Sequence, residues 1–239
     1  LPKHHMGRPQ KDLRAHFNGI LWIARSGARW EDLPARYGPH QTVYSCFCRW
    51  RDDGTLERIF HALGANAELE ELNIDSTTSK VSEQAAVVQE NDEAGRLIGR
   101  TRGGKNTKIH ALVNREGIPV CLSISAGNCA DCDQAIPLLQ KFGKIKGSNI
   151  LGDRAYGAKK IRLFLAEQGA QYTIPPTKNL LHPWKYDRQT YKRRNVIERC
   201  FCRLKDFRRI ATRYDKRADS FQAFLFLAAS AVIFSILHI

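Results

Sequence analysis

The sequence has few acidic residues, an odd number of cysteines and no segment at its start that resembles a secretory leader. It contains 24 Asp and Glu residues against 38 Lys and Arg residues, and its formal net charge is +14. Seven cysteines are an odd count for the disulfide framework of a secreted protein. Because no basic segment followed by an apolar run stands at the start, we predict a reducing, cytoplasmic location.

Long apolar runs are also rare, with one exception at the end of the chain. Residues 221–239 are mostly apolar and long enough to raise the possibility of a membrane span. Gln222, Ser230, Ser235 and His238 interrupt this run. We therefore predict a buried helix rather than a membrane-spanning one, and no membrane partner.

The length of 239 residues suits one full-sized domain and a small appendage, because globular domains usually contain about 100–200 residues. The composition, 43% hydrophobic and 26% charged, is that of an ordinary globular protein with a buried core. The first residue is Leu1 rather than methionine. We take this to indicate a truncated reading frame, a non-standard start or a frameshifted product, with residues missing in front.

The positive charge is concentrated in one segment. Residues 188–217 contain twelve Lys or Arg and three Asp or Glu, so this segment carries nine of the fourteen net charges. A strongly basic protein favours a polyanionic partner, because binding releases condensed counterions. Nucleic acid is therefore the first candidate for a partner.

Apolar periodicity predicts a helical part at the start of the chain. Helical spacing is found at residues 11–26, which Gly27 ends, and again at residues 41–51 and 55–63. We predict that residues 1–66 form a small all-helical domain that binds DNA. The alternative is that these helices brace a catalytic domain and mediate dimer contacts.

The remainder, residues 67–239, has the pattern of an α/β domain in the order βββαβαβα. Strands are predicted at residues 72–76, 108–114, 119–125, 150–153 and 171–174, and helices at residues 135–142, 159–168 and 190–209. Asp131 or Asp133 is expected to cap the first of these helices. Residues 89–106 are polar and glycine-rich, which predicts a mobile loop that clamps DNA.

Three carboxylates occupy notable positions in this order. Asp75 ends the first predicted strand, Asp153 ends the fourth, and Glu198 lies on the final predicted helix. They converge only if the sheet places the first and fourth strands side by side. Taken singly, they have simpler interpretations: a turn residue, a helix cap, and an exposed ion-pair partner of Arg194 or Arg203.

A converged carboxylate trio suits one kind of chemistry. Mg²⁺ and Mn²⁺ prefer carboxylate oxygen, and two such ions can hold the attacking and leaving oxygens of an in-line phosphoryl displacement. In that arrangement a shared aspartate, here Asp75, bridges the two ions.

The segment around Glu198 has a distinctive spacing. Tyr191, Arg194, Glu198 and Lys205 stand in the pattern Tyr-x2-Arg-x3-Glu-x6-Lys, and on one continuous helix they share a face. The pattern resembles the signature of bacterial insertion sequence transposases. Further similarity extends over almost the whole chain and points to the insertion sequence 5 family, in residues 7–9, 30–38, 73–77, 102–113, 152–156 and 208–216.

The resemblance implies a ribonuclease H-like mixed sheet flanked by helices, behind the small N-terminal helical domain. It implies that Asp75, Asp153 and Glu198 are the ligands of two Mg²⁺ or Mn²⁺ ions. Three residues of the signature would contact the transposon end or its phosphates, namely Tyr191, Arg194 and Lys205, which agrees with the chemistry of these side chains.

The implied reaction has two steps at one site. Water cleaves DNA at the terminal inverted repeats, and the freed 3′-hydroxyl then attacks double-stranded target DNA. We expect a homodimer or larger assembly on the bacterial nucleoid, because two DNA ends must be held together. Arg102 and Lys105 of the predicted loop are expected to contact DNA as well. The alternatives are a truncated or domesticated transposase that only binds DNA, and a nuclease of the same fold.

Two further signals carry less weight. Cys129 and Cys132 have the spacing of zinc ligands, but no second such pair accompanies them, so a structural zinc site is not predicted. His110 lies on the second predicted strand of this part and could approach the metal site. A hydrogen-bonded interior histidine is the preferred interpretation.

Overall fold

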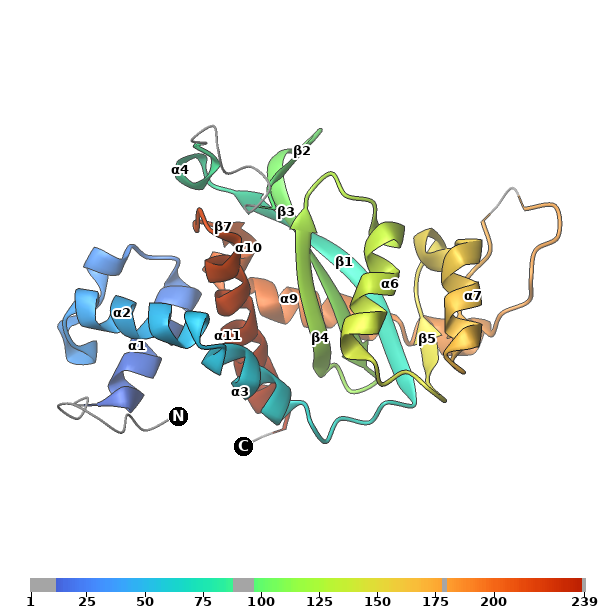
Figure 1. The fold of residues 1–239 in the computed structure, drawn as a ribbon, viewed down its shortest axis with the longest axis horizontal. Helices are drawn as coiled ribbons and strands as arrows, with labels where there is room; N and C mark the ends of the chain where they lie inside the picture. The colour runs from blue at the N-terminus through green and yellow to red at the C-terminus, as the bar shows by residue number, and fades with distance from the viewer. Residues whose placement is uncertain (1–11, 88–96, 178–179, 238–239) are drawn as a thin grey trace.

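A computed structural model of the protein describes residues 12–87, 97–177 and 180–237 (Figure 1). Residues 7–9 and the first part of the predicted mobile loop, residues 89–96, lie outside these ranges. The first helices are α1 (Leu13–Ser26), α2 (His40–Asp52) and α3 (Thr55–Leu63), with short 3₁₀ helices at Trp30–Asp32 and Ala35–Tyr37. They agree with the predicted helices to within about two residues.

The ends of α1 follow from local chemistry. The side chain of Asp12 accepts a hydrogen bond from the backbone N–H of Ala15 at 3.0 Å, which satisfies one of the unpaired donors of the first turn. Gly27 ends the helix with φ of 69°, a left-handed conformation that glycine adopts without a steric cost. Between these ends, one face of α1 is buried and includes Ile20 and Ile23.

A mixed seven-stranded sheet forms the centre of the molecule. The strands are β1 (Glu71–Val81), β2 (Gly99–Thr101), β3 (Gly104–Asn114), β4 (Pro119–Ala126), β5 (Asn149–Leu151), β6 (Gln171–Thr173) and β7 (Thr212–Arg213). Strand β3 pairs antiparallel with β1 on one side and with β4 on the other, whereas β1, β5 and β6 are parallel. The order across the sheet is therefore β4-β3-β1-β5-β6. In addition, β2 pairs with the first residues of β3, and β7 pairs with the last residues of β1.

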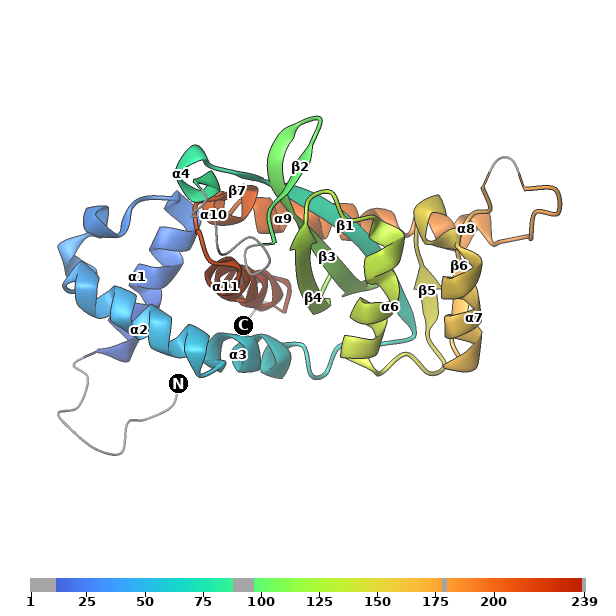
Figure 2. The same cartoon turned by 45° about the horizontal axis from the view of Figure 1, so that its top comes forward.

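Helices cover both faces of this sheet (Figures 1 and 2). The remaining helices are α4 (Glu83–Ala86), α6 (Asp131–Phe142), a 3₁₀ helix η3 (Arg154–Gly157), α7 (Lys159–Glu167), α8 (Arg188–Lys192), α9 (Asn195–Lys205), α10 (Arg208–Ala211) and α11 (Ala218–Ile236). Helices α6 and α7 lie in front of the sheet in Figure 1, and α9 lies behind it. The predicted order βββαβαβα and the mixed sheet flanked by helices are confirmed.

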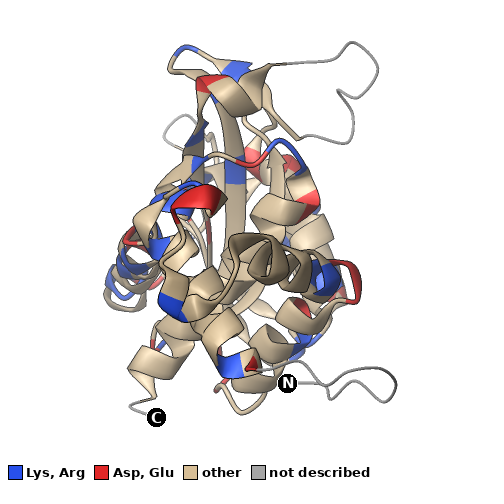
Figure 3. Ribbon diagram, turned by 90° about the vertical axis from the view of Figure 1, so that its left-hand side faces the viewer, with Lys and Arg blue, Asp and Glu red and all other residues tan. Residues whose placement is uncertain are grey.

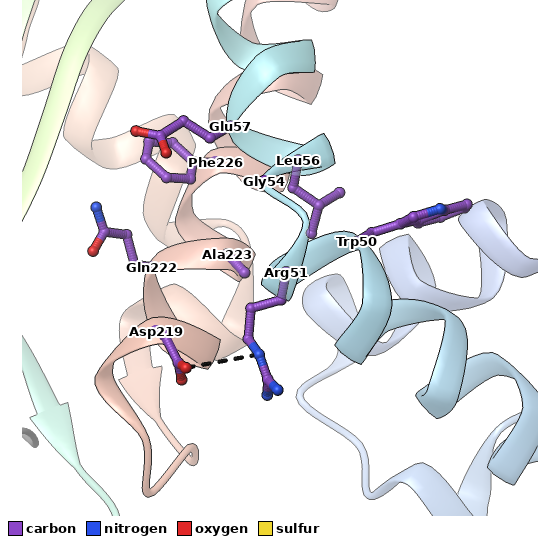
Figure 4. A pocket seen from close by; sticks show the side chains of 9 residues that line it. All are labelled: Trp50, Arg51, Gly54, Leu56, Glu57, Asp219, Gln222, Ala223 and Phe226. Carbon is purple, nitrogen blue, oxygen red and sulfur yellow. Dashed lines mark ion pairs between the residues drawn. The ribbon is translucent and has the colours of Figure 1, made fainter. Parts of the chain in front are cut away.

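The C-terminal helix α11 joins the N-terminal helices to the sheet. It contacts α1, α2 and α3 as well as β4 and α9, and the rings of Phe47 and Phe224 stack at a centroid distance of 4.4 Å. Figure 4 shows a small pocket at this contact, where Arg51 of α2 points toward Asp219 of α11. Helix α11 is long and apolar enough to cross a membrane, but 67% of its apolar window is buried in the protein. The prediction of a buried helix is confirmed.

Strand β1 is longer than predicted. It extends from Glu71 to Val81, so Asp75 lies inside the strand and not at its end. The polar segment after Asp75 remains extended because β3 pairs with it as far as Lys80. Part of the predicted mobile loop is also ordered, since residues 99–106 form a hairpin of β2 and β3.

The predicted helix over residues 190–209 is divided into α8, α9 and α10. Between α8 and α9 the backbone stays helical but tightens, because Arg193 N, Arg194 N and Ile197 N each bond to the carbonyl oxygen three residues earlier. A 3₁₀ turn advances 120° per residue instead of 100°. The single continuous face predicted for Tyr191, Arg194, Glu198 and Lys205 is therefore wrong at its N-terminal end.

Candidate active site

Asp75 and Asp153 lie on neighbouring parallel strands. The last paired residues of β1 and β5 are Asn73 and Leu151, and each aspartate follows two residues later. Since parallel strands in register end side by side, both carboxylates reach the same edge of the sheet. Asp153 also caps η3, where its Oδ1 accepts a hydrogen bond from Ala155 N at 2.9 Å. The predicted adjacency of the first and fourth strands is confirmed.

Both carboxylate oxygens of Asp75 are engaged. Oδ1 accepts a hydrogen bond from the backbone N–H of Ser76 at 2.8 Å, and Oδ2 accepts one from Arg194 at 2.7 Å. Burial raises the pKa of Asp75, and the nearby charge of Asp153 raises it further, against the lowering effects of Ser76 and Arg194. Two aspartates that repel each other in a partly desolvated site favour a cationic ligand.

Glu198 joins this pair through Arg194. Arg194 stands at the N-terminal end of α9, where its Nη1 lies 2.7 Å from Asp75 Oδ2 and its Nη2 lies 2.7 Å from Glu198 Oε1. The Glu198 side chain is 55% exposed, whereas that of Arg194 is 17% exposed. The arrangement thus brings carboxylates from β1, β5 and α9 to one end of the sheet.

The donor set fits a hard divalent cation. Asp75, Asp153 and Glu198 present only carboxylate oxygen, and neither thiol nor imidazole groups are needed to complete it. Among residues 12–87, 97–177 and 180–237, no three Asp, Glu, His or Cys side chains already lie close enough together to hold an ion. Arg194 holds Asp75 and Glu198 on its own nitrogens instead.

Two family models match this chain. A family model described as "Transposase DDE domain" matches residues 67–233, which is more than half of the sequence. The chain belongs to the DDE transposase family. A second model, "Putative transposase of IS4/5 family", matches residues 1–60. The protein is therefore an insertion sequence transposase of the polynucleotidyl transferase type, and members of this family use divalent metal.

Curated relatives of the transposase come from insertion sequences. The chain is 35% identical over 129 residues to a "Putative transposase for insertion sequence element IS6501" of Brucella ovis, covering 53% of this chain and 96% of the relative. It is 26% identical over 160 residues to a "Putative transposase for insertion sequence element IS402" of Burkholderia cepacia, covering 60% and 74%.

A solved structure supports the fold. The transposase resembles the piggyBac transposase in a synaptic complex with hairpin DNA, with a TM-score of 0.56 at 12% identity, over 97% of this chain and 66% of that one. At this identity the similarity concerns the ribonuclease H-like fold, which agrees with the prediction from sequence.

The remaining residues of the transposase signature lie near the carboxylates or along α9. The ring of Tyr191 stands at 6.0 Å from the guanidinium carbon of Arg194 and packs edge-on against Tyr186 at 5.6 Å. Lys205 is partly buried, and burial lowers its pKa. It follows Glu198 by seven residues, or about 10 Å along a helix axis. The two residues therefore lie about two helical turns apart on α9.

Four residues near Asp75, namely Ser76, Lys108, Asp131 and Tyr156, were not predicted from sequence to belong to the site. Asp131 accepts hydrogen bonds from Ser76 Oγ at 2.7 Å and Lys108 Nζ at 2.8 Å, which lowers its pKa although burial opposes this shift. It is the first residue of α6, after the N-cap Ala130, so the predicted capping role is wrong for both Asp131 and Asp133.

Tyr156 completes this environment. Its side chain is buried at 2% exposure. Burial raises the pKa of its hydroxyl, and the nearby charges of Asp75, Asp131 and Asp153 raise that pKa further. No sequence signal reveals the network of Ser76, Lys108 and Asp131, because its members are far apart in the chain.

The β2–β3 hairpin carries the other two predicted DNA contacts. Arg102 and Lys105 are both exposed, and Lys105 Nζ donates a hydrogen bond to the carbonyl oxygen of Ala86 at 2.9 Å. In Figure 2 the hairpin projects from the body of the molecule. Viewed from the end that carries α1 and α2, basic segments are interspersed with acidic ones (Figure 3). Arg102 and Lys105 are accessible because the hairpin projects, and not because they belong to a uniformly basic face.

His110 is an interior residue, as predicted. Its Nε2 lies 2.8 Å from Ser125 Oγ, and burial lowers its pKa to about 4. In the unfolded chain this histidine has a pKa of roughly 6.5, so it binds a proton there at pH values at which it remains neutral in the folded protein. The free energy of unfolding therefore decreases as the pH is lowered from about 6.5 to about 4.

We expect this histidine to reduce the free energy of unfolding by about 2 kcal/mol between pH 7 and pH 5. Urea denaturation of the wild type and of His110→Gln at both pH values measures the difference. The Gln variant should show a pH dependence that is smaller by that amount, and equal slopes in the two proteins would contradict the assignment.

Proposed function

We propose that the transposase cleaves DNA at the terminal inverted repeats of its insertion sequence and joins the freed 3′-hydroxyls to target DNA. The observation that carries this proposal is the placement of Asp75 on β1 beside the end of β5, which Asp153 follows, with Glu198 paired to Asp75 through Arg194. Asp75, Asp153 and Glu198 would hold two Mg²⁺ or Mn²⁺ ions, which when bound activate the attacking oxygen and stabilise the leaving one.

The chain's own residues contribute position and charge. Asp75, whose Oδ1 accepts a hydrogen bond from Ser76 N on a long strand, would be one of the residues that hold the cations. Tyr191, Arg194 and Lys205 would bind phosphates of the transposon end, since a guanidinium fork matches phosphate geometry and a lysine supplies a compact charge. Their spread along α8 and α9 supports a DNA path that runs beside these helices.

A joining reaction tests this proposal. Purified transposase is incubated with Mg²⁺, a labelled duplex carrying the inverted repeat read from the flanking genomic DNA, and a supercoiled plasmid. We expect labelled plasmid, the product of end cleavage followed by strand transfer. Nicked DNA without joined product would indicate a nuclease, and binding without cleavage would indicate a DNA-binding remnant; either result would contradict the proposal.

We further propose a functional division of the chain, with residues 1–66 as the DNA-binding helical domain and residues 67–239 as the catalytic domain. Because α11 packs against α1, α2 and α3, the two parts share one hydrophobic core. The transposase would act on the nucleoid as a homodimer or larger assembly, since two ends are needed for one transposition event. Gel filtration with and without end DNA measures this state.

The exposed hairpin provides a separate prediction for DNA binding. Replacing both Arg102 and Lys105 with Ala should flatten the slope of log K against log salt concentration by up to about 2, since each phosphate contact contributes about 0.9. Fluorescence anisotropy with a labelled duplex over a salt series measures the slope. Lys144→Ala/Lys146→Ala removes the same charge at the opposite end of the sheet and should leave the slope unchanged. Equal slopes for the two double variants would exclude the hairpin as a DNA contact.

A further inference from the structure

Arg194 occupies the position between two of the three candidate metal ligands. Its two terminal nitrogens each bind a different carboxylate at 2.7 Å, one from β1 and one from the next turn of α9. Side-chain ion pairs four residues apart on a helix are common, so the contact with Glu198 alone would need no explanation. The contact with Asp75, which lies 119 residues away in the chain, makes Arg194 a bridge across the site.

The bridge uses the oxygens that a metal ion would need. Oδ2 of Asp75 is held by Arg194 and Oδ1 by the backbone N–H of Ser76, so Asp75 has no oxygen without a partner. Oε1 of Glu198 is held by the same guanidinium. A cation that approaches these oxygens must share them with the guanidinium, because only the second lone pair of each oxygen remains open to it. The ion pairs therefore weaken metal binding for as long as they hold.

A partly buried guanidinium beside a divalent cation would also be repelled. Arg194 is 17% exposed, so solvent screens its charge only in part. Once freed, its side chain can turn toward the exposed surface beside Tyr191, whose ring lies at 6.0 Å. A DNA phosphate there would satisfy the guanidinium fork that the carboxylates no longer hold.

We propose that Arg194 acts as a built-in counter-ion that competes with metal for Asp75 and Glu198, so that DNA binding and metal binding favour each other. The inference rests on the proposed metal site. In the DNA-free protein Arg194 holds the carboxylates together and weakens metal binding. A phosphate that draws Arg194 away removes the competitor, and the coupling between the two ligands is reciprocal. The transposase thereby takes up metal most readily when DNA is already in place.

The test measures Mn²⁺ binding to the DNA-free protein by the electron paramagnetic resonance signal of the free ion. Arg194→Gln should bind Mn²⁺ about tenfold more tightly than the wild type, within the usual range of roughly 5–150-fold for coupled sites. Arg194→Lys, which keeps the charge but lacks the planar fork that reaches both carboxylates, should be intermediate. Arg193→Gln is the matched control, because it removes a neighbouring arginine whose partner is Glu71, at 2.6 Å. It should bind Mn²⁺ like the wild type.

The possible results distinguish a failure of the Arg194 competition from a failure of the proposed metal site. Unchanged or weaker Mn²⁺ binding in Arg194→Gln, with thermal melting showing a folded protein, would overturn the competition and leave Arg194 as a residue that positions the carboxylates. If Arg194→Gln fails to fold, Arg194→Lys decides, and wild-type affinity in that variant would overturn the inference. Absence of Mn²⁺ binding in every variant would overturn both the inference and the proposed metal site. If the tightening persists when Asp75→Asn is added to Arg194→Gln, the ion binds elsewhere and the inference fails.

A second experiment, with a DNA duplex, measures the effect of DNA on metal binding. Adding a 30-base-pair duplex should tighten Mn²⁺ binding by the wild type by about the same factor as the Arg194→Gln substitution, and should tighten binding by Arg194→Gln much less. An equal effect of the duplex on both proteins would contradict a route through Arg194.

Discussion

Replacing Asp75 with Asn should reduce the formation of joined DNA at least a thousandfold. The substitution keeps the shape of the side chain and removes the charge that the proposed site needs to hold two cations. A thousandfold loss corresponds to about 4 kcal/mol of transition-state stabilisation, which is the scale expected for metal assistance of phosphoryl transfer. The joining assay with labelled end DNA and plasmid, read at equal protein concentration, measures the effect.

The controls for Asp75→Asn distinguish catalysis from folding and from DNA binding. Asp133→Asn makes the same chemical change at an exposed aspartate of α6, which pairs with Lys160, and should leave joining unchanged. Asp75→Asn should bind end DNA at least as tightly as the wild type, because one negative charge near the phosphates is lost. Retention of more than a tenth of the joining activity would contradict the role proposed for Asp75.

The second large effect is expected in stability, from the buried pair of Arg209 and Asp215. Arg209 Nη1 lies 2.9 Å from Asp215 Oδ1, and the two side chains are 6% and 12% exposed. Arg209 Nη2 also donates a hydrogen bond to the carbonyl oxygen of Ala28 at 3.0 Å, which ties the C-terminal segment to the loop after α1. Arg209→Met should lower the free energy of unfolding by about 3–5 kcal/mol at pH 7, because a buried carboxylate is left without its partner.

A double substitution separates the charge effect from the loss of packing. Arg209→Met/Asp215→Asn removes both charges, so it should recover a substantial part of the stability lost in Arg209→Met alone. Urea denaturation of the wild type and both variants completes the comparison. A loss below about 1 kcal/mol in Arg209→Met would show that the pair contributes little, as most exposed pairs do.

The parts of the fold that follow local rules could be predicted from the sequence. Apolar periodicity and Gly27 define α1, and runs of apolar and β-forming residues define β3 and β4. The extent of β1 could not be predicted, because the polar segment after Asp75 becomes a strand only through its pairing with β3. The tightening between α8 and α9 has the same kind of cause: Arg193 and Arg194 both reach β1, to Glu71 and Asp75.

The residues of the candidate site could be predicted from the sequence, but the contacts that they make with one another could not. The order of strands places Asp75 beside Asp153, and the spacing of the signature identifies Glu198. The two interpretations of Glu198 turn out to be compatible, since it is both a candidate ligand and an ion-pair partner of Arg194. The contact of Arg194 with Asp75 and the hydrogen bond from Ser76 to Asp131 depend on tertiary structure. No local sequence pattern therefore predicts them.

The position of α11 has a consequence for how the nascent chain matures. The partners of Phe47 and Phe60 include Phe224 and Phe226, which the ribosome adds more than 160 residues later. Until these last residues emerge, the first three helices expose the apolar surface that α11 covers in the folded protein. Acquisition of the native state is therefore post-translational for both ends of the molecule, and a chain that terminates before α11 would leave its opening helices open to chaperones and proteases.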